Sequence, residues 1–303
     1  MAPGASTTKP KTKVIYVMGA GHSGSTILGV ALGNCSDFFF AGEVEEWLVK
    51  SGRPPWADAE QAAFWQTVAA ETDGADLFGS KAVPAIERSS ALLRVDRWPT
   101  RRRLLGRYRR ISEELLCAIS RTAGASNVID TSHFPLRARE LKKLDAIDLY
   151  LVFLVRDPHG VIDSNLRQFK AHEVAERRLR TLMLNVNLWF TLLMSVVVFY
   201  GQRRDRRLFL RHETFVEDPE SVLRQILELV GSQAAMPDLE ELQVGAPLEG
   251  NRLIRRGVIS LKRQPQRAER ASLLTSVMQL PWRAILARLR PVATVPAAPE
   301  QAG

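Results

Sequence analysis

A glycine-rich segment near the N-terminus has the residue types of an anion-binding loop. Residues 21–26 read GHSGST, between a short β-branched run at 13–18 and an apolar, helix-compatible run at 27–32. In a strand–loop–helix unit, glycines and hydroxyl residues at the helix N-terminus present N–H and O–H groups to a phosphate-like anion. The candidate anion-binding residues are Gly21, His22, Ser23, Gly24, Ser25 and Thr26.

The same loop admits three other interpretations. With Gly19 it fits the GxGxxG spacing of a dinucleotide fingerprint, and Glu43 lies about the right distance downstream for a ribose contact. Gly19 and Gly24 also fit the spacing of a nucleotide-triphosphatase loop, but Ser25 stands where that loop needs Lys. The third alternative is a tight strand-to-helix turn without a ligand.

A second anion-binding arrangement follows a strand in the middle of the chain. Arg156 directly follows the apolar run 148–155, and Ser164 comes eight residues after it, two turns into the following helix. Both side chains can face one anion, because the guanidinium is a forked donor and the hydroxyl adds a third hydrogen bond. A ligand with phosphates at two separated points needs such a second clamp, whereas a dinucleotide fold does not.

Strands that alternate with helices must position these groups. The strand-like runs are 13–18, 127–130, 148–155 and 207–210. This alternation predicts an α/β fold, a three-layer αβα arrangement around a central parallel sheet. Such sheets bind ligands at the carboxyl ends of their strands. The polar groups at those ends are the glycine loop, residues 130–133, residues 156–164, and His212 with Glu213.

The composition is that of an ordinary globular protein with a basic surface. Apolar residues make up 46% and charged residues 25%, which excludes collagen-like, disordered and disulfide-scaffold chains. The formal net charge is +9, and only nine of the 42 basic residues are Lys, so the excess suits an anionic partner. Two cysteines cannot build a disulfide framework, and no His, Cys and Asp spacing indicates a metal site.

We expect one domain over residues 13–290, with flexible tails at 1–12 and 291–303. Residues 46–123 read as a mostly helical insertion that shapes an acceptor pocket. The arginine run at 101–110 is typical of a solvated helix face, although it could guide an acidic acceptor or touch a membrane surface. No aromatic-interleaved platform accompanies it, so no nucleic-acid partner is expected.

The longest apolar run, residues 188–200, continues a helical spacing that starts with Leu179, Met183 and Val186. A membrane-spanning helix needs about 20 apolar residues, so this run is too short, and we expect a buried core helix and no membrane span. Residues 1–13 contain no apolar stretch of signal-peptide length. The expected location is therefore the cytoplasm.

Five segments, in order along the chain, resemble the PAPS-dependent sulfotransferases, most closely the bacterial group. They are GHSGSTILGVALG at 21–33, IDTSHFP at 129–135, LVRDPHGVIDS at 154–164, LRHETFVEDPESVLRQILELVG at 210–231 and GNRLIRRG at 250–257. The resemblance implies a P-loop NTPase-like sulfotransferase fold. It also implies an enzyme that moves a sulfonate group from 3′-phosphoadenylyl sulfate (PAPS) to a hydroxyl of a small-molecule, glycan or lipid acceptor, without a metal, releasing PAP.

The resemblance also implies roles for individual residues. The loop 21–26 would hold the 5′-phosphosulfate, and Arg156 and Ser164 would hold the 3′-phosphate. A late loop would close over the 3′-phosphate and adenine through Asn251, Arg252, Arg255 and Arg256.

The implied catalytic residues are Glu43, His22 and His133. Glu43 would take the proton of the acceptor hydroxyl, with Glu45 and His133 as alternative bases. His22 stands where many relatives carry Lys or Arg, and if protonated it would stabilise charge on the bridging oxygen. His133 stands where the bacterial group has Lys; it either replaces that charge or marks a different substrate geometry.

Two other classes of function stay open from the sequence. One is a different P-loop-like nucleotide-binding enzyme, kinase-like or a dehydrogenase, that uses the same glycine loop. The other is a non-catalytic relative that kept the fold and lost the chemistry.

Overall fold

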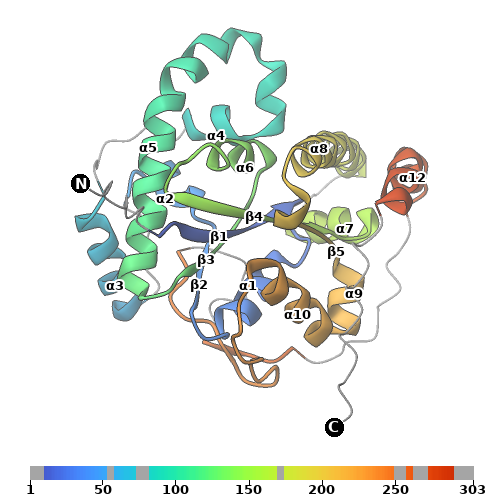
Figure 1. The fold of residues 1–303 in the computed structure, drawn as a ribbon. Helices are drawn as coiled ribbons and strands as arrows, with labels where there is room; N and C mark the ends of the chain where they lie inside the picture. The colour runs from blue at the N-terminus through green and yellow to red at the C-terminus, as the bar shows by residue number, and fades with distance from the viewer. Residues whose placement is uncertain are drawn as a thin grey trace, which may run out of the picture.

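Short β-branched and aromatic runs form a five-stranded parallel sheet in the computed structural model. The model describes residues 10–52, 58–72, 82–168, 174–248, 257–261 and 272–289. The strands are β1 (Thr12–Gly19), β2 (Phe38–Gly42), β3 (Asn127–His133), β4 (Ile147–Val155) and β5 (Arg207–Arg211), in the spatial order β2-β3-β1-β4-β5. Helices cover both faces of the sheet (Figure 1), so the predicted α/β three-layer fold is confirmed.

Side-chain alternation along β1 divides the core into two layers. Val14, Tyr16 and Met18 point to one face, and Ile15 and Val17 point to the other. The first face packs against α5 (Trp98–Ala123), α6 (Pro135–Leu141) and α8 (Val174–Tyr200). The second face packs against α1 (Ser25–Gly33) and α10 (Pro219–Val230). All of these strand residues are buried, as expected for a parallel sheet covered on both sides.

The remaining elements lie around this sandwich. They are α2 (Glu45–Val49), α3 (Ala59–Ala70), α4 (Ala82–Glu87), the short 3-10 helices η1 (Ser89–Leu93), η2 (Val95–Arg97) and η3 (Arg204–Arg206), α7 (Pro158–Gln168), α9 (His212–Glu217), α11 (Leu273–Met278), α12 (Leu280–Arg288), and an antiparallel pair of β6 (Leu242–Gln243) and β7 (Val258–Ile259). The described part of 46–123 is mostly helical. Residues 1–9 and 290–303, and with them most of both predicted tails, lie outside the described residues.

A buried ion cluster ties the helical segment before β3 to the end of that strand. The Arg137 guanidinium lies 3.0 Å from Asp130 and 3.2 Å from Glu87, and donates a hydrogen bond to the Tyr108 hydroxyl. All four side chains are buried. Removing one partner of a buried pair leaves an uncompensated charge and costs about 3–5 kcal/mol. The cluster therefore fixes the end of β3, where His133 lies.

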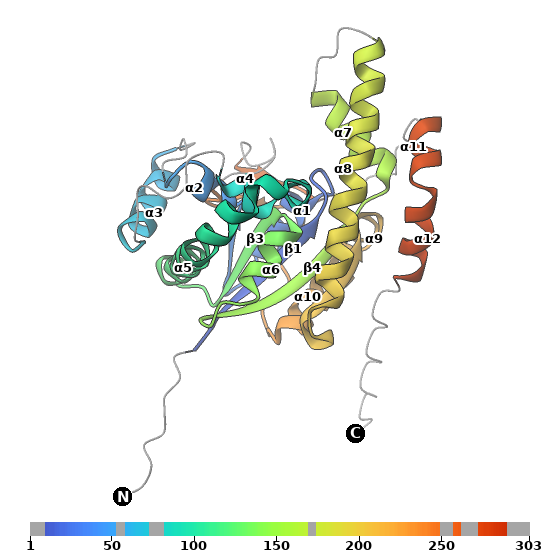
Figure 2. The ribbon, with the colours of Figure 1, turned by 90° about the horizontal axis from the view of Figure 1, so that it is seen from above.

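Helix α8 differs from the predicted buried core helix. It is 27 residues long, and within Glu176–Tyr200 an 18-residue window with a mean hydropathy of 2.0 is long and apolar enough to cross a membrane. Only 33% of that window is buried, and Leu179, Met183 and Val186, predicted to face the core, are all exposed. Helical periodicity identifies one apolar face, but the core covers a different side of this helix. Figure 2 shows α8 projecting beyond the sheet, with α11 and α12 beside it.

Candidate functional site

The glycine loop between β1 and α1 is held in a backbone conformation that suits an anion. His22 and Gly24 have φ angles of 66° and 89°, both in the left-handed region. Gly24 is also the N-cap of α1 and contributes no capping side chain, so the first N–H groups of the helix lack this intramolecular acceptor. Left-handed residues alternating with other conformations turn successive N–H groups toward one side, which forms an anion-binding nest.

Packing leaves no room for side chains at two glycines of this segment. A Cβ atom on Gly19 would overlap the carbonyl oxygen of Leu154 in the neighbouring strand β4. A Cβ on Gly24 would overlap the imidazole ring of His212, at the start of α9. The loop therefore approaches both β4 and the end of β5 as closely as its backbone allows.

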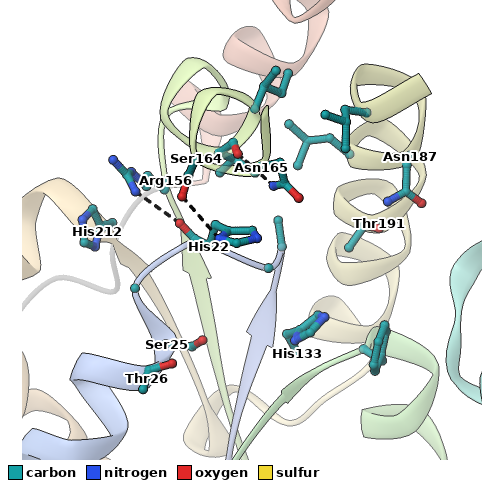
Figure 3. Close-up of a pocket in the computed structure, with 18 of the residues that line it drawn as sticks. His22, Ser25, Thr26, His133, Arg156, Ser164, Asn165, Asn187, Thr191 and His212 are labelled. Atoms are coloured by element: carbon teal, nitrogen blue, oxygen red, sulfur yellow. Dashed lines mark hydrogen bonds between the residues drawn. The ribbon is translucent and has the colours of Figure 1, made fainter. Parts of the chain in front are cut away.

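Arg156 and Ser164 both reach this loop, from the end of β4 and from α7. Arg156 Nη1 donates a hydrogen bond to the His22 carbonyl oxygen at 3.3 Å, and Ser164 Oγ lies 3.3 Å from His22 Nδ1 (Figure 3). The loop and the predicted second clamp are therefore adjacent and meet at His22. At the same edge, the Glu213 carboxylate accepts a hydrogen bond from the Asp157 N–H at 2.8 Å and fixes the turn that carries Arg156.

These groups open into one cavity of about 810 Å³. Its lining includes the predicted residues Gly21, His22, Gly24, Ser25, Thr26, Glu43, His133, Arg156 and Ser164. Ser23 belongs to the loop but is buried and does not line the cavity. The four residues of the predicted late loop, Asn251, Arg252, Arg255 and Arg256, lie outside the described residues.

Three of the five histidines of the chain line this cavity. Burial, followed by the nearby Arg156 charge, lowers the pKa of His22 below 6.5. Burial also lowers the pKa of His133 to about 4, and burial together with Arg156 lowers the pKa of His212 to about 4. At neutral pH the three rings are therefore uncharged, and a neutral His133 supplies hydrogen bonds but not the charge of a lysine. The lining arginines, Arg156 and Arg88, carry positive charge.

The position of Glu43 follows from a strand that the sequence did not reveal. Strand β2 pairs with β3, and Gly42 lies opposite Asp130, so the residue after β2 enters the same edge of the sheet. Glu43 lines the cavity, whereas Glu45 is buried and does not. The Glu45 N–H donates to Ser132 Oγ at 3.2 Å, and burial, with added repulsion from Glu87 and Glu43, raises the pKa of its carboxyl group. Of the two carboxylates considered as the base, Glu43 is the one that lines the cavity, as the third candidate, His133, also does.

Other polar residues of the cavity lining were not among the candidate site residues, including Arg88, Asn165, Asn187 and Thr191. His212 also lines the cavity, and its place after β5 marked it from the sequence only as a polar group at a strand end. Asn187 and Thr191 belong to α8, and Arg88 precedes η1, where no local motif marks them. Within the described ranges, no group of three or more His, Cys, Asp or Glu side chains could hold a metal ion.

The arrangement defines a class of protein: an α/β protein in which a glycine loop and an Arg–Ser pair meet in one cavity at the carboxyl edge of a parallel sheet. Residues 14–235 match the family model described as "Sulfotransferase family", and the chain belongs to that family. No curated protein matches it in sequence.

One solved structure supports the fold, and a second is similar to a smaller degree. The sulfotransferase domain from the curacin biosynthetic pathway superimposes with a TM-score of 0.51 at 15% identity, covering 91% of this chain and 99% of that domain. The sulfotransferase domain from the Synechococcus PCC 7002 olefin synthase has a TM-score of 0.49 at 17% identity, covering 91% and 96%. At these identities the similarity concerns the fold alone.

Proposed function

We propose that the protein transfers a sulfonate group from PAPS to a hydroxyl group of a small-molecule, glycan or lipid acceptor. The observation that carries the proposal is the meeting of two anion-binding groups in one cavity: the left-handed loop around His22, and the Arg156–Ser164 pair that contacts it. Family membership supports sulfonyl transfer in general. The donor and the acceptor are the parts that we propose.

The residues around the loop fit a donor with phosphate groups at two points. His212 Nδ1, in the cavity lining next to Gly24, is a buried atom that has no hydrogen-bond partner among the described residues. Buried polar atoms usually have partners, so such atoms at a cavity favour a ligand that supplies them. We assign the 5′-phosphosulfate to residues 21–26 and the 3′-phosphate to Arg156 and Ser164.

In this proposal the donor supplies the sulfonate group and the leaving phosphate, and the protein positions the reactants and stabilises charge. Glu43 accepts the proton of the acceptor hydroxyl. His22 donates a hydrogen bond to the developing charge, and a bound anion would raise its pKa and favour the protonated ring. His133, neutral when free, orients the acceptor by hydrogen bonding. Arg156 keeps the loop in place through the His22 carbonyl and donates to the 3′-phosphate.

The test combines binding and transfer. Calorimetry compares PAP, ATP and NAD, and mass spectrometry then follows a host extract incubated with the protein and PAPS. We expect PAP to bind much more tightly than ATP or NAD, and an extract compound to gain one sulfonate group. Preference for ATP or NAD would favour another nucleotide-dependent enzyme. PAP binding without transfer to any acceptor would favour a non-catalytic relative.

The predicted late loop would complete the donor site from residues that the structure does not describe. A cytoplasmic location and the absence of a nucleic-acid partner also stay predictions.

A further inference from the structure

Exposed apolar side chains gather on one part of the surface. Among the residues that the structure describes, fifteen large apolar side chains are exposed, and all except Val258 lie on three segments. The fourteen are Leu93, Val95 and Trp98; Leu179, Leu182, Met183, Val186, Leu193, Val197 and Tyr200; and Leu273, Leu274, Val277 and Leu280. Both η1 and α11 contact α8, so the three segments adjoin, and we call this surface the apolar face.

The seven α8 residues form one stripe. Successive residues of an α-helix are about 100° apart around its axis. The seven exposed residues of α8 therefore lie within an arc of about 100° on one side of the helix. Their side chains are between 42% and 63% exposed. The opposite side of the helix is buried on the sheet through Leu188, Leu192 and Val198. The exposed stripe is therefore a different side of α8 from the one that packs into the core.

The lack of charged residues in this part of α8 indicates which kind of partner the stripe fits. Residues 181–202 contain no charged residue, over six turns of helix. A helix pair in water carries charged residues beside its apolar seam, and these set the partner and orientation. In α8 the positions beside the stripe are occupied by the uncharged residues Asn187, Trp189 and Met194. A second protein helix is thus a poor match, and hydrocarbon is a good one.

Arginines flank the apolar segments in the sequence. Residues 88–110 contain nine arginines and one acidic residue, and residues 176–180 and 203–207 contain three and four arginines with one acidic residue each. Arg97 and Arg178 are exposed directly beside exposed apolar residues. Apolar side chains bordered by arginine are typical of surfaces that bind the interface of an anionic bilayer.

We propose that the protein docks on an anionic lipid bilayer through the apolar face, with α8 lying along the membrane surface. A transmembrane orientation does not fit, because the other side of α8 packs on the sheet and lines the cavity through Leu188 and Thr191. Asn187 is both exposed and part of the cavity lining, so the docked face adjoins the cavity. The inference goes beyond the proposed function and does not depend on it.

Vesicle flotation of the full chain tests the docking directly, without any measurement of activity. We expect the protein to float with vesicles of phosphatidylcholine mixed with phosphatidylglycerol, and much less with pure phosphatidylcholine. Raising the salt from about 0.1 M to about 1 M shortens the screening length from roughly 10 Å to 3 Å and should release most of the protein. Failure to bind the anionic vesicles would overturn the proposal.

Matched variants locate the contact. Met183→Glu/Val186→Glu should weaken vesicle binding by about tenfold or more, because two apolar contacts become charged. Arg97→Ala/Arg178→Ala, which leaves the apolar side chains intact, should weaken it by about 25-fold, or fivefold for each arginine. Val258→Glu replaces an exposed apolar residue outside the face and should bind like the wild type.

Two outcomes would contradict the assignment. Normal binding by both double variants, each checked for an unchanged melting temperature, would place the contact elsewhere. A dimer in sedimentation velocity that Met183→Glu/Val186→Glu dissociates, with no vesicle binding by the wild type, would assign the face to a second copy of the chain.

Discussion

Replacing Arg156 with Ala should selectively weaken binding of a nucleotide that carries a 3′-phosphate. The guanidinium is half-buried beside the loop, and one of its N–H groups is used by the His22 carbonyl at 3.3 Å. A hydrogen bond to a charged group contributes about 1.5–3 kcal/mol. Losing it corresponds to an increase in Kd of about 10- to 150-fold.

Titration calorimetry with PAP and with AMP, which lacks the 3′-phosphate, separates the two roles of this side chain. PAP affinity should fall by the stated factor while AMP affinity stays nearly unchanged. Arg224→Ala, on α10 and outside the cavity lining, controls for the loss of one positive charge. An equal loss for both nucleotides would show that Arg156 acts only by holding the loop through His22, and the assignment of the 3′-phosphate would be wrong.

Three further predictions concern turnover, packing and pH. Glu43→Gln should lower turnover by about 100-fold or more with nearly unchanged PAP affinity, measured by transfer kinetics and calorimetry, and undiminished turnover would remove Glu43 as the base. In urea titrations, Gly19→Ala should lower the free energy of unfolding by about 3 kcal/mol, because the new Cβ meets the backbone of Leu154. Gly106→Ala, which has open space around the new Cβ, should raise the free energy of unfolding by about 1 kcal/mol. Burial holds the pKa of His133 at about 4, against 6.5 for an unburied histidine, so below pH 6.5 the unfolded chain binds a proton that the folded chain excludes. Between pH 7 and pH 5 the wild type should therefore lose about 2 kcal/mol more stability than His133→Gln in matched urea titrations, and equal losses would contradict a buried neutral ring.

Four of the five strands could be predicted from the sequence because each is a run of β-branched or aromatic residues next to a turn. Strand β2 was not predicted, although its three consecutive phenylalanines at 38–40 are an aromatic run of the same kind. Pairing with β3 makes it a strand. The exposed side of α8 was assigned wrongly for a related reason, since periodicity does not say which neighbour covers a face.

The site shows the same division between local and long-range information. Loop residues 21–26, Arg156 and Ser164 were selected because glycine, hydroxyl and arginine at strand ends carry a chemical meaning of their own. Arg88 and Asn187 reach the cavity only through the packing of η1 and α8, which no short motif encodes. The neutral state of His133 likewise depends on burial, which residue type alone does not reveal.

The central place of β1 has a consequence for synthesis of the chain. Both of its neighbours, β3 and β4, are encoded more than 100 residues later, so the strand has no native partner until β3, at about residue 133, has left the ribosome. At ordinary elongation rates of about 5–20 residues per second, the nascent apolar strand waits roughly 6–23 s. Chaperones that shield short hydrophobic segments during translation should therefore raise the yield of folded protein, and should act before β3 emerges.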